Sequence, residues 1–214
     1  MQFHGDGYHS LKRAIDVTAS IVFMLFFGPL MLLIPLAIKL QSRGPILYRQ
    51  ERIGKDGHPF WMLKFRTMRL NTSDEIHRKH VRSLIRLNSH PIELGQDSLK
   101  IQRDPRITVL GRWLRKLSLD ELPQLFNVLG GEMSCVGPRP PLPYEYELYE
   151  ERHKERLSAL PGITGVWQVE ARNRVPFEEM VQMDINYIKD MNLGLDLWTM
   201  LRTPIEMIRG SGGG

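Results

Sequence analysis

Cysteine is almost missing from this sequence, since Cys135 is the only one among 214 residues. A single cysteine excludes an intramolecular disulfide and any metal site built from several cysteines, and it suits a reducing compartment. Two familiar nucleotide-binding signatures are also missing: the chain has neither a Walker-type phosphate loop nor the glycine fingerprint of a dinucleotide-binding fold. If the protein binds a nucleotide, it does so through a different arrangement.

Acidic residues are scarce in one part of the chain. Residues 39–116 contain 18 Lys or Arg against 7 Asp or Glu, a balance of +11, whereas residues 117–214 contain 9 against 15, a balance of −6. Concentrated positive charge attracts anionic lipid headgroups, nucleic acid or a phosphorylated substrate, and solvated surface helices carry it too. The charge balance by itself does not choose among these.

Charge is missing altogether from residues 17–38, a run of 22 residues. A helix rises about 1.5 Å per residue, so this run would be about 33 Å long, and a hydrocarbon core is about 30 Å thick. Length therefore permits a membrane span. Gly28 and Pro29 interrupt the run near its middle, and Pro35 interrupts it again. Proline removes an amide donor and clashes with the carbonyl four residues back, so a bend is expected.

Basic residues lie on both sides of this apolar run. They are Lys12 and Arg13 before it and Lys39, Arg43, Arg49 and Arg52 after it. Positive charge marks the cytoplasmic side of a membrane segment, so both ends are expected on that side. We therefore predict a monotopic membrane protein with a re-entrant helix-break-helix in residues 1–42, broken at Gly28 and Pro29. A tilted or kinked span and a buried pair of core helices are the alternatives.

Residues 43–209 are predicted to form one compact cytoplasmic domain of the α+β class, predominantly helical, with a flexible tail at 210–214. Short strands at 45–49 and 59–63 flank a turn at Asp56 and Gly57, which predicts a β-hairpin and no strand after it. Helical periodicity is found at 107–117, 119–129, 177–189 and 193–208. We expect the last helix to pack its apolar side on the core, with a place on the bilayer surface as the alternative.

The densest candidate site is the sequence LSLDELPQL at residues 117–125. Ser118 and Glu121 have the spacing of a capping box, so a helix is expected to begin between Ser118 and Asp120. Asp120 would then lie at a helix N-terminus, where free amides and the helix dipole stabilise a carboxylate or a phosphate by about 1–2 kcal/mol. The plain alternative is that Asp120 and Glu121 are ordinary acids of a first helical turn.

The same two carboxylates lie close in sequence to Arg112, Arg115 and Lys116. Acids beside cations can hold a divalent ion and a phosphorylated ligand together. Mg²⁺ fits best, because it takes one or two carboxylates and fills its shell with water and phosphate oxygens.

Three later stretches add candidate ligand contacts. Arg139 lies between prolines, where a restricted backbone lowers the entropy lost when a guanidinium binds phosphate; an ordinary loop arginine is the equal alternative. Thr164 lies between glycines, as a backbone that approaches a ligand closely would require. Gln168 and Arg172 add polar groups a few residues later. None of these patterns is specific by itself.

Taken in order, the motifs make the chain resemble the bacterial polyprenyl-phosphate phosphoglycosyl transferases of the monotopic type. These sugar transferases begin the assembly of exopolysaccharide, O-antigen and other glycans. The resemblance covers residues 11–208, and it is specific because all the motifs occur in the family's order. They are KRAIDV at 12–17, FGP at 27–29, KFRTM at 64–68, DPRIT at 104–108, SLDELPQLFNVL at 118–129, MSCVGPRP at 133–140, PGITG at 161–165 and WQVEARN at 167–173.

The resemblance implies transfer of a sugar-1-phosphate from a nucleotide diphosphate sugar, usually uridine-linked, to polyprenyl (undecaprenyl) phosphate, with release of a nucleoside monophosphate. It implies that Asp120 attacks the β-phosphate and carries a covalent phosphosugar intermediate, with Glu121 as its partner. An aspartyl phosphate divides one difficult displacement into two easier steps. Mg²⁺ is the implied cofactor, with Asp120 as its contact.

The resemblance also implies roles for residues outside this acidic pair. Binding of the phosphates and the nucleotide falls to Lys64, Arg115, Arg139, Arg172, Thr164 and Gln168, and support of the site falls to Asp184 and Tyr187. The implied partners are a nucleotide diphosphate sugar, polyprenyl phosphate and membrane lipids, without nucleic acid, and a homodimer is left open.

The implied location is the bacterial inner membrane, with the catalytic domain on its cytoplasmic face. Two rival functions are a membrane-tethered basic adaptor for anionic lipid or nucleic acid, and a Mg²⁺-dependent lipid phosphatase. Each makes a different prediction for Asp120 and Glu121, because an adaptor needs neither residue and a phosphatase releases inorganic phosphate.

Overall fold

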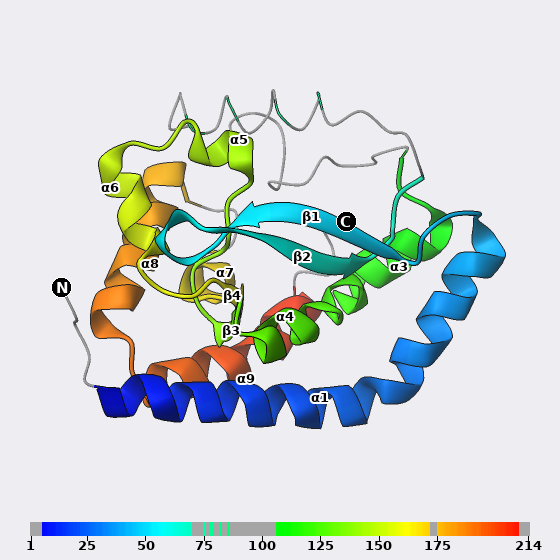
Figure 1. The fold of residues 1–214 in the computed structure, drawn as a ribbon, viewed down its shortest axis with the longest axis horizontal. Coiled ribbons are helices and arrows are strands. Elements are labelled where there is room, and N and C mark those ends of the chain that lie inside the picture. The colour runs from blue at the N-terminus through cyan, green and yellow to red at the C-terminus, as the bar shows by residue number, and fades with distance from the viewer. Residues whose placement is uncertain are drawn as a thin grey trace.

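The computed structural model describes residues 6–69, 75, 78, 82, 85, 106–171 and 175–209. One long helix, α1, runs along an edge of the molecule, a two-stranded hairpin crosses its middle, and shorter helices surround the hairpin (Figure 1). This mostly helical α+β arrangement confirms the predicted fold class. The tail at 210–214 lies outside the described residues.

The apolar run lies in α1, a helix of 36 residues, Asp6–Gln41, that contains Pro29 and Pro35. Figure 1 shows α1 running straight for most of its length and then turning sharply toward the hairpin. We predicted two helices separated by a break, whereas the structure has one helix that bends. A proline removes a single intrahelical hydrogen bond, so the turns on either side of it can stay bonded. The re-entrant path stays a prediction.

The helix α1 is long and apolar enough to cross a membrane, over Gly7–Gln41, by length and composition. Only 11% of its most apolar stretch is buried within the protein. A core helix would be covered on most of its surface. The alternative of a buried pair of core helices is therefore wrong.

The predicted hairpin is confirmed. Strands β1, Leu47–Ile53, and β2, Pro59–Phe65, pair antiparallel, joined by the 3₁₀ turn η1, Lys55–Gly57. Asp56 and Gly57 have φ values of 55° and 81°. Glycine adopts this left-handed region at little conformational cost and aspartate tolerates it, so an Asp-Gly pair is typical of such a turn.

A second sheet was missed by the sequence analysis. Strands β3, Ser134–Val136, and β4, Gly162–Thr164, pair in parallel. A Cβ on Gly162 would lie 2.1 Å from the amide nitrogen of Gly137, so glycine is required where the two backbones meet. We attributed this glycine pattern to close approach of a ligand; the neighbour is instead another strand. Three-residue strands are too short to show a period in sequence.

The remaining elements are mostly short. They are α3 (Val109–Lys116), η2 (Leu119–Glu121), α4 (Gln124–Gly130), α5 (Pro143–Tyr146), α6 (Glu151–Lys154), η3 (Glu155–Leu157), α7 (Val166–Glu170), α8 (Phe177–Asp190) and α9 (Leu193–Arg209). The bounds of α3, α8 and α9 agree with the predicted helices to within two residues. The predicted helix at 119–129 is divided into η2 and α4.

The burial of α9 differs from the prediction. Its buried side chains include Asp196 and Thr199, whereas Leu197, Leu201 and Ile205 are exposed. The polar side of α9 faces inward because it has bonding partners there: Asp196 binds Tyr8 and Tyr187. Leu195 and Met200 of α9 nevertheless pack against the buried cluster that contains Val128 and Tyr187, so the expectation that α9 packs its apolar side on the core is confirmed in part.

Three clusters of buried apolar residues hold the fold together. One joins the hairpin to α4, β3 and α8, a second lies around Trp167 between α7 and α8, and a third joins Ile34 and Ile38 of α1 to Phe65 and Leu114. The third cluster packs the end of α1 against the end of β2 and against α3, the helix that precedes the acidic pair.

Candidate active site

The acidic pair lies in η2, between α3 and α4. Asp120 is only 8% exposed. Glu121 accepts a hydrogen bond from Lys64 of β2, with 2.7 Å between Lys64 Nζ and Glu121 Oε1, and both side chains are partly exposed. The structure thus brings together Asp120, Glu121 and Lys64 from two elements far apart in sequence.

Ser118 precedes this pair in a left-handed conformation, with φ of 51°. Its side chain makes no capping hydrogen bond, and its amide instead donates to the carbonyl of Arg115 at 3.2 Å. A residue in the left-handed region just after the last turn is a common helix stop. The predicted capping box is therefore wrong: Ser118 ends α3, and α4 begins only at Gln124.

Arg115 is held toward the same region by the end of β2. Its Nε donates to Thr67 Oγ1 at 2.8 Å. Thr108, the N-cap of α3, bonds the Thr67 carbonyl through its amide at 2.9 Å. A Cβ on Gly111 would lie 2.2 Å from that carbonyl, so glycine lets α3 lie against the strand end. The contact between the end of β2 and α3 thus positions both Lys64 and Arg115 beside η2.

Arg139 lies in the loop that follows β3. That loop is held by β1: Arg52 Nη1 donates to the Pro140 carbonyl at 2.8 Å, and the Ile53 amide donates to the Pro141 carbonyl at 3.0 Å. Arg52 is buried. Burial and the nearby charge of Arg139 lower the pKa of Arg52 to about 10, opposed by acids that include Glu121.

Arg52 is a residue that the sequence analysis missed. Both Arg139 and Glu121 act on its charge, so the Arg139 loop and the acidic pair lie within electrostatic reach of one buried guanidinium. In sequence Arg52 is one of many basic residues after the apolar run. Nothing in that pattern separates a buried cation from solvated ones.

Asp184 supports the Arg139 loop through another arginine. The fully buried Asp184 carboxylate pairs with Arg156. Arg156 also donates to Tyr149 Oη at 3.0 Å, and weakly to the Arg139 carbonyl at 3.5 Å. Burial raises the pKa of Asp184 to about 6, although Arg156 acts in the opposite direction. Asp184 therefore contacts the Arg139 loop indirectly, with Arg156 between them.

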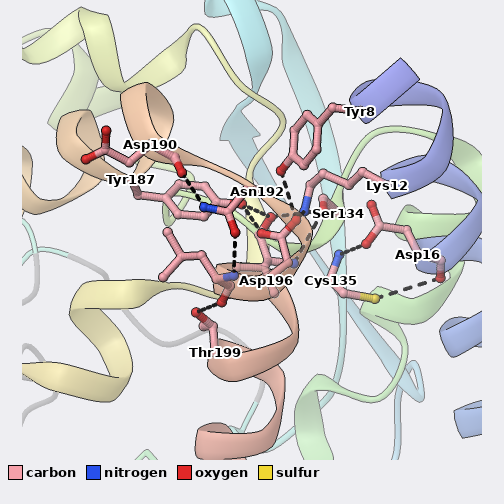
Figure 2. Close-up of polar contacts among 12 residues, drawn as sticks. Tyr8, Lys12, Asp16, Ser134, Cys135, Tyr187, Asp190, Asn192, Asp196 and Thr199 are labelled. Atoms are coloured by element: carbon pink, nitrogen blue, oxygen red, sulfur yellow. Dashed lines mark hydrogen bonds and ion pairs between the residues drawn. The ribbon is translucent and has the colours of Figure 1, made fainter. Parts of the chain in front are cut away.

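Tyr187 reaches a different part of the molecule. Its hydroxyl donates to Asp196 Oδ1 at 2.6 Å and also lies 3.2 Å from the Val136 carbonyl oxygen. Tyr8 and Lys12 of α1 both donate to the other oxygen, Asp196 Oδ2, at 2.9 Å (Figure 2). Tyr187 therefore helps to fasten α1, and the structure does not bring it together with Asp184 on one ligand.

The KRAIDV motif supplies further bonds between α1 and the body. Arg13 Nη2 donates to the Leu129 carbonyl at 2.9 Å, at the end of α4, where carbonyls lack intrahelical partners. Asp16 Oδ1 accepts the Cys135 amide at 3.0 Å (Figure 2). We assigned Lys12 and Arg13 to membrane orientation; the structure adds a second use, which is to dock the helix.

The remaining predicted contacts are placed as follows. Thr164 Oγ1 lies 2.9 Å from Thr203 Oγ1 of α9. Gln168 lies on α7, and its Oε1 is buried without a hydrogen-bond partner. Arg172 lies outside the described residues. Thr164 is thus engaged with α9, while Gln168 retains an unused acceptor.

The donors available for a metal ion are few. Within the described part of the chain, no three His, Cys, Asp or Glu side chains converge on one point. This excludes an all-protein cage there, but Mg²⁺ needs only one or two carboxylates when phosphate oxygens and water complete its shell. The adjacent carboxylates of Asp120 and Glu121 fit that requirement.

Comparisons with known proteins identify the family of this chain. Residues 7–210 match the family profile described as bacterial sugar transferase. The exopolysaccharide production protein ExoY of Rhizobium meliloti is 43% identical over 202 residues, covering 94% of this chain and 87% of the relative. The UDP-glucose:undecaprenyl-phosphate glucose-1-phosphate transferase of Caulobacter vibrioides is 42% identical over 201 residues, covering 90% and 67%.

A third relative, the undecaprenyl-phosphate galactose phosphotransferase of Salmonella typhimurium, is 38% identical over 204 residues. The match covers 94% of this chain and 41% of that protein. Because the family profile spans nearly the whole sequence, including every motif and the acidic pair, the chain belongs to the bacterial sugar transferase family.

Proposed function

We propose that the protein transfers a sugar-1-phosphate from a nucleotide diphosphate sugar, with uridine as the nucleoside, to undecaprenyl phosphate. Family membership supports the reaction class, and the names of two relatives supply the lipid acceptor. The observation that carries the assignment of residues is the acidic pair, in which a buried Asp120 adjoins a Glu121 already paired with Lys64. The protein is therefore proposed to start a polysaccharide on its lipid carrier.

The proposed first step uses Asp120 as the nucleophile. A carboxylate oxygen attacks the β-phosphorus, which carries the sugar. The bond from that phosphorus to the bridging oxygen breaks, and its electron pair leaves with the nucleoside monophosphate. In the second step an oxygen of undecaprenyl phosphate attacks the same phosphorus, and the Asp120 carboxylate is released.

The neighbours of Asp120 support these steps. Lys64 sits where its ammonium can offset charge on the transferred phosphate, and its bond to Glu121 fixes its position. Arg115, in the last turn of α3, and Arg139, in the loop after β3, are proposed to hold the diphosphate. Mg²⁺ bound at Asp120, beside Glu121, would neutralise part of the negative charge of the diphosphate.

The membrane placement is part of the proposal. An apolar α1 that bends and returns to one face would hold Asp120 at the level of the acceptor's phosphate, on the cytoplasmic side of the inner membrane. Cysteines placed at His9 and at Lys55, in a Cys135→Ser background, are expected to react with a membrane-impermeant maleimide from the cytoplasmic side only. Labelling of His9→Cys from the opposite side would establish a span.

The reaction is tested by Asp120→Asn with UDP-sugars, Mg²⁺ and undecaprenyl phosphate. We expect release of nucleoside monophosphate to fall by about 10³-fold or more, because loss of a covalent nucleophile removes the first step. Asp56→Asn is the matched control, since Asp56 is exposed in the hairpin turn and asparagine tolerates its positive φ. Undiminished turnover in Asp120→Asn would refute the proposed role of Asp120 as nucleophile. Release of inorganic phosphate instead would identify a lipid phosphatase.

A further inference from the structure

Strand β2 pairs with β1 along one edge, and α4 meets its other edge. In an antiparallel pair, every second residue turns its N–H and C=O away from the partner strand, and these groups need other partners. One side chain of α4 supplies them: Asn127 Nδ2 donates to the Trp61 carbonyl at 2.8 Å, and Asn127 Oδ1 accepts from the Leu63 amide at 3.0 Å. Asn127 thus takes the place of a third strand at this point.

Both donors of the Asn127 amide are used. Besides the Trp61 carbonyl, Nδ2 donates to Glu132 Oε2 at 2.7 Å, and the side chain is only 2% exposed. An aspartate at this position would lack both donors, and an alanine would lack the acceptor as well. The bonds to β2 therefore depend on an amide at residue 127.

The two elements that Asn127 joins lead to opposite members of the ion pair in the candidate site. Lys64 follows directly after the bonded segment of β2, and α4 begins at Gln124, just after η2 and Glu121. Lys64 Nζ lies 2.7 Å from Glu121 Oε1. The placement of β2 against α4 therefore decides whether the Lys64 ammonium reaches the acidic pair.

Apolar packing between β2 and α4 does not by itself fix this placement. Met62 of β2 and Val128 of α4 belong to one buried cluster, but the hydrophobic effect is non-directional. The two hydrogen bonds from Asn127 are directional, and they fix the position along a strand whose residues are about 3.3 Å apart. A slip of one residue would turn Lys64 to the other face of the hairpin.

We propose that Asn127 is a positioning residue for the transfer reaction: it fixes β2 against α4 so that Lys64 meets Glu121 beside the reacting phosphate. The inference rests on the proposed function and adds a residue that acts through Lys64 without touching the substrate. Loss of the Asn127 amide should therefore slow the chemical step more than it weakens binding of the UDP-sugar.

The test is Asn127→Ala, measured as release of nucleoside monophosphate from UDP-sugars with Mg²⁺ and undecaprenyl phosphate. We expect kcat to fall about 10²-fold, because a misplacement of about 1 Å can cost that much, with KM for the UDP-sugar changed less than about threefold. Val181→Ala is the control for lost stability, since Val181 is fully buried in the cluster around Trp167. Its kcat should be unchanged at a temperature where thermal unfolding shows both variants to be folded.

A double-mutant cycle with Lys64→Met tests whether Asn127 acts through Lys64. Lys64→Met alone should lower kcat about 10²-fold, because it removes a cation beside the transferred phosphate. Adding Asn127→Ala should then lower kcat by less than about threefold more, since the side chain that Asn127 positions is gone. A merely structural role of Asn127 would make the two losses multiply.

The outcomes separate this inference from the proposed function. Losses that multiply in the cycle, or a raised KM with unchanged kcat in Asn127→Ala, would overturn the positioning role and leave the proposed function standing. Asn127→Asp keeps the volume and the acceptor but loses both donors, so it gives the same comparison if Asn127→Ala does not fold. Wild-type protein that releases no nucleoside monophosphate would refute the proposed function, and this inference with it.

Discussion

The two halves of α1 meet the rest of the protein in different ways. The first half is held by directional polar bonds: Lys12 reaches α9, Arg13 reaches the end of α4, and Asp16 reaches β3. The second half meets the body through the apolar contacts of Ile34 and Ile38. Hydrogen bonds fix distance and orientation, whereas apolar packing mainly rewards area.

The difference indicates separate tasks along one helix. The first half sets how α1 sits against the body, near β3 and α4, and so relates the membrane to the strand that leads into the Arg139 loop. Large apolar side chains are exposed on both halves, and the most exposed ones lie on the second half. They include Leu25, Phe26, Leu32, Leu33 and Leu40, each more than half exposed. A patch of this kind on one helix marks a contact surface, which the proposed membrane placement assigns to lipid.

The largest effect is expected from Asp196→Ala, which tests whether polar bonds hold the first half of α1. The carboxylate accepts from Lys12, Tyr8 and Tyr187, so its loss leaves the Lys12 ammonium and the Tyr8 hydroxyl without that acceptor in a largely buried place, and leaves Tyr187 only the longer contact to the Val136 carbonyl. We expect the free energy of unfolding in detergent to fall by about 3–5 kcal/mol. Denaturant titration measures it, with the exposed Asp190→Ala as control. Equal losses in the two variants would show that the polar bonds do not hold the first half.

The second half is tested by Ile38→Ala. Ile38 is 2% exposed against Phe65 and Leu114, so truncation removes buried area and leaves a cavity, at a cost of about 2–4 kcal/mol. Leu36→Ala lies two residues away and is 58% exposed. We expect it to change the stability by less than about 0.5 kcal/mol in detergent. A similar cost for both would mean that the second half is not docked through one face.

The bend between the halves is tested by Pro29→Leu. Leucine restores one intrahelical hydrogen bond and favours a straight helix, which draws Ile34 and Ile38 away from their cluster. We expect a net change in stability of about 1 kcal/mol and increased labelling of His9→Cys from the side opposite the cytoplasm. Pro35→Leu is the companion variant. Unchanged topology in Pro29→Leu together with altered topology in Pro35→Leu would move the bend to the second proline.

The smallest expected effect concerns the reactivity of Cys135, which the first half of α1 contacts through Asp16. Burial, and then the Asp16 carboxylate, raise the pKa of Cys135 from 9.0 to about 12. The folded protein therefore keeps its thiol proton in a range where the unfolded chain loses it, so this group's contribution to stability falls as pH rises from about 9 to about 12.

At pH 8 we expect maleimide to react with Cys135 far more slowly than with a cysteine at the exposed Ser158, introduced in a Cys135→Ser chain. Asp16→Asn should speed the reaction of Cys135 modestly, because it removes one cause of the raised pKa. Fast labelling of the wild type would contradict tight docking of the first half.

Local signals accounted for the parts of the fold that sequence predicted well. The hairpin turn needs positive φ at Asp56 and Gly57, and α8 shows its period over more than three turns. The three-residue strands β3 and β4 carry no such period. The role of Ser118 was misread because a capping box and a left-handed helix stop use the same residue type.

The residues of the candidate site likewise fall into those predicted from the sequence and those that were not. Asp120, Glu121 and Lys64 were predicted from motifs, and the structure brings them together. Arg52, Arg156 and Asn127 were not predicted as site residues, because their importance comes from burial and from the bonds that they make to other elements. Those properties arise only when residues distant in sequence are packed together.

The bonds between Tyr8 or Lys12 and Asp196 join residues more than 180 positions apart. At a synthesis rate of about 5–20 residues per second, α1 leaves the ribosome roughly 10–40 s before Asp196 exists. During that interval Tyr8 and Lys12 lack the carboxylate that holds them, although Leu129 and Cys135, the partners of Arg13 and Asp16, are made earlier. On the proposed membrane placement, α1 enters the bilayer before its bonds to α9 exist, and α9 then fastens a helix that is already in place.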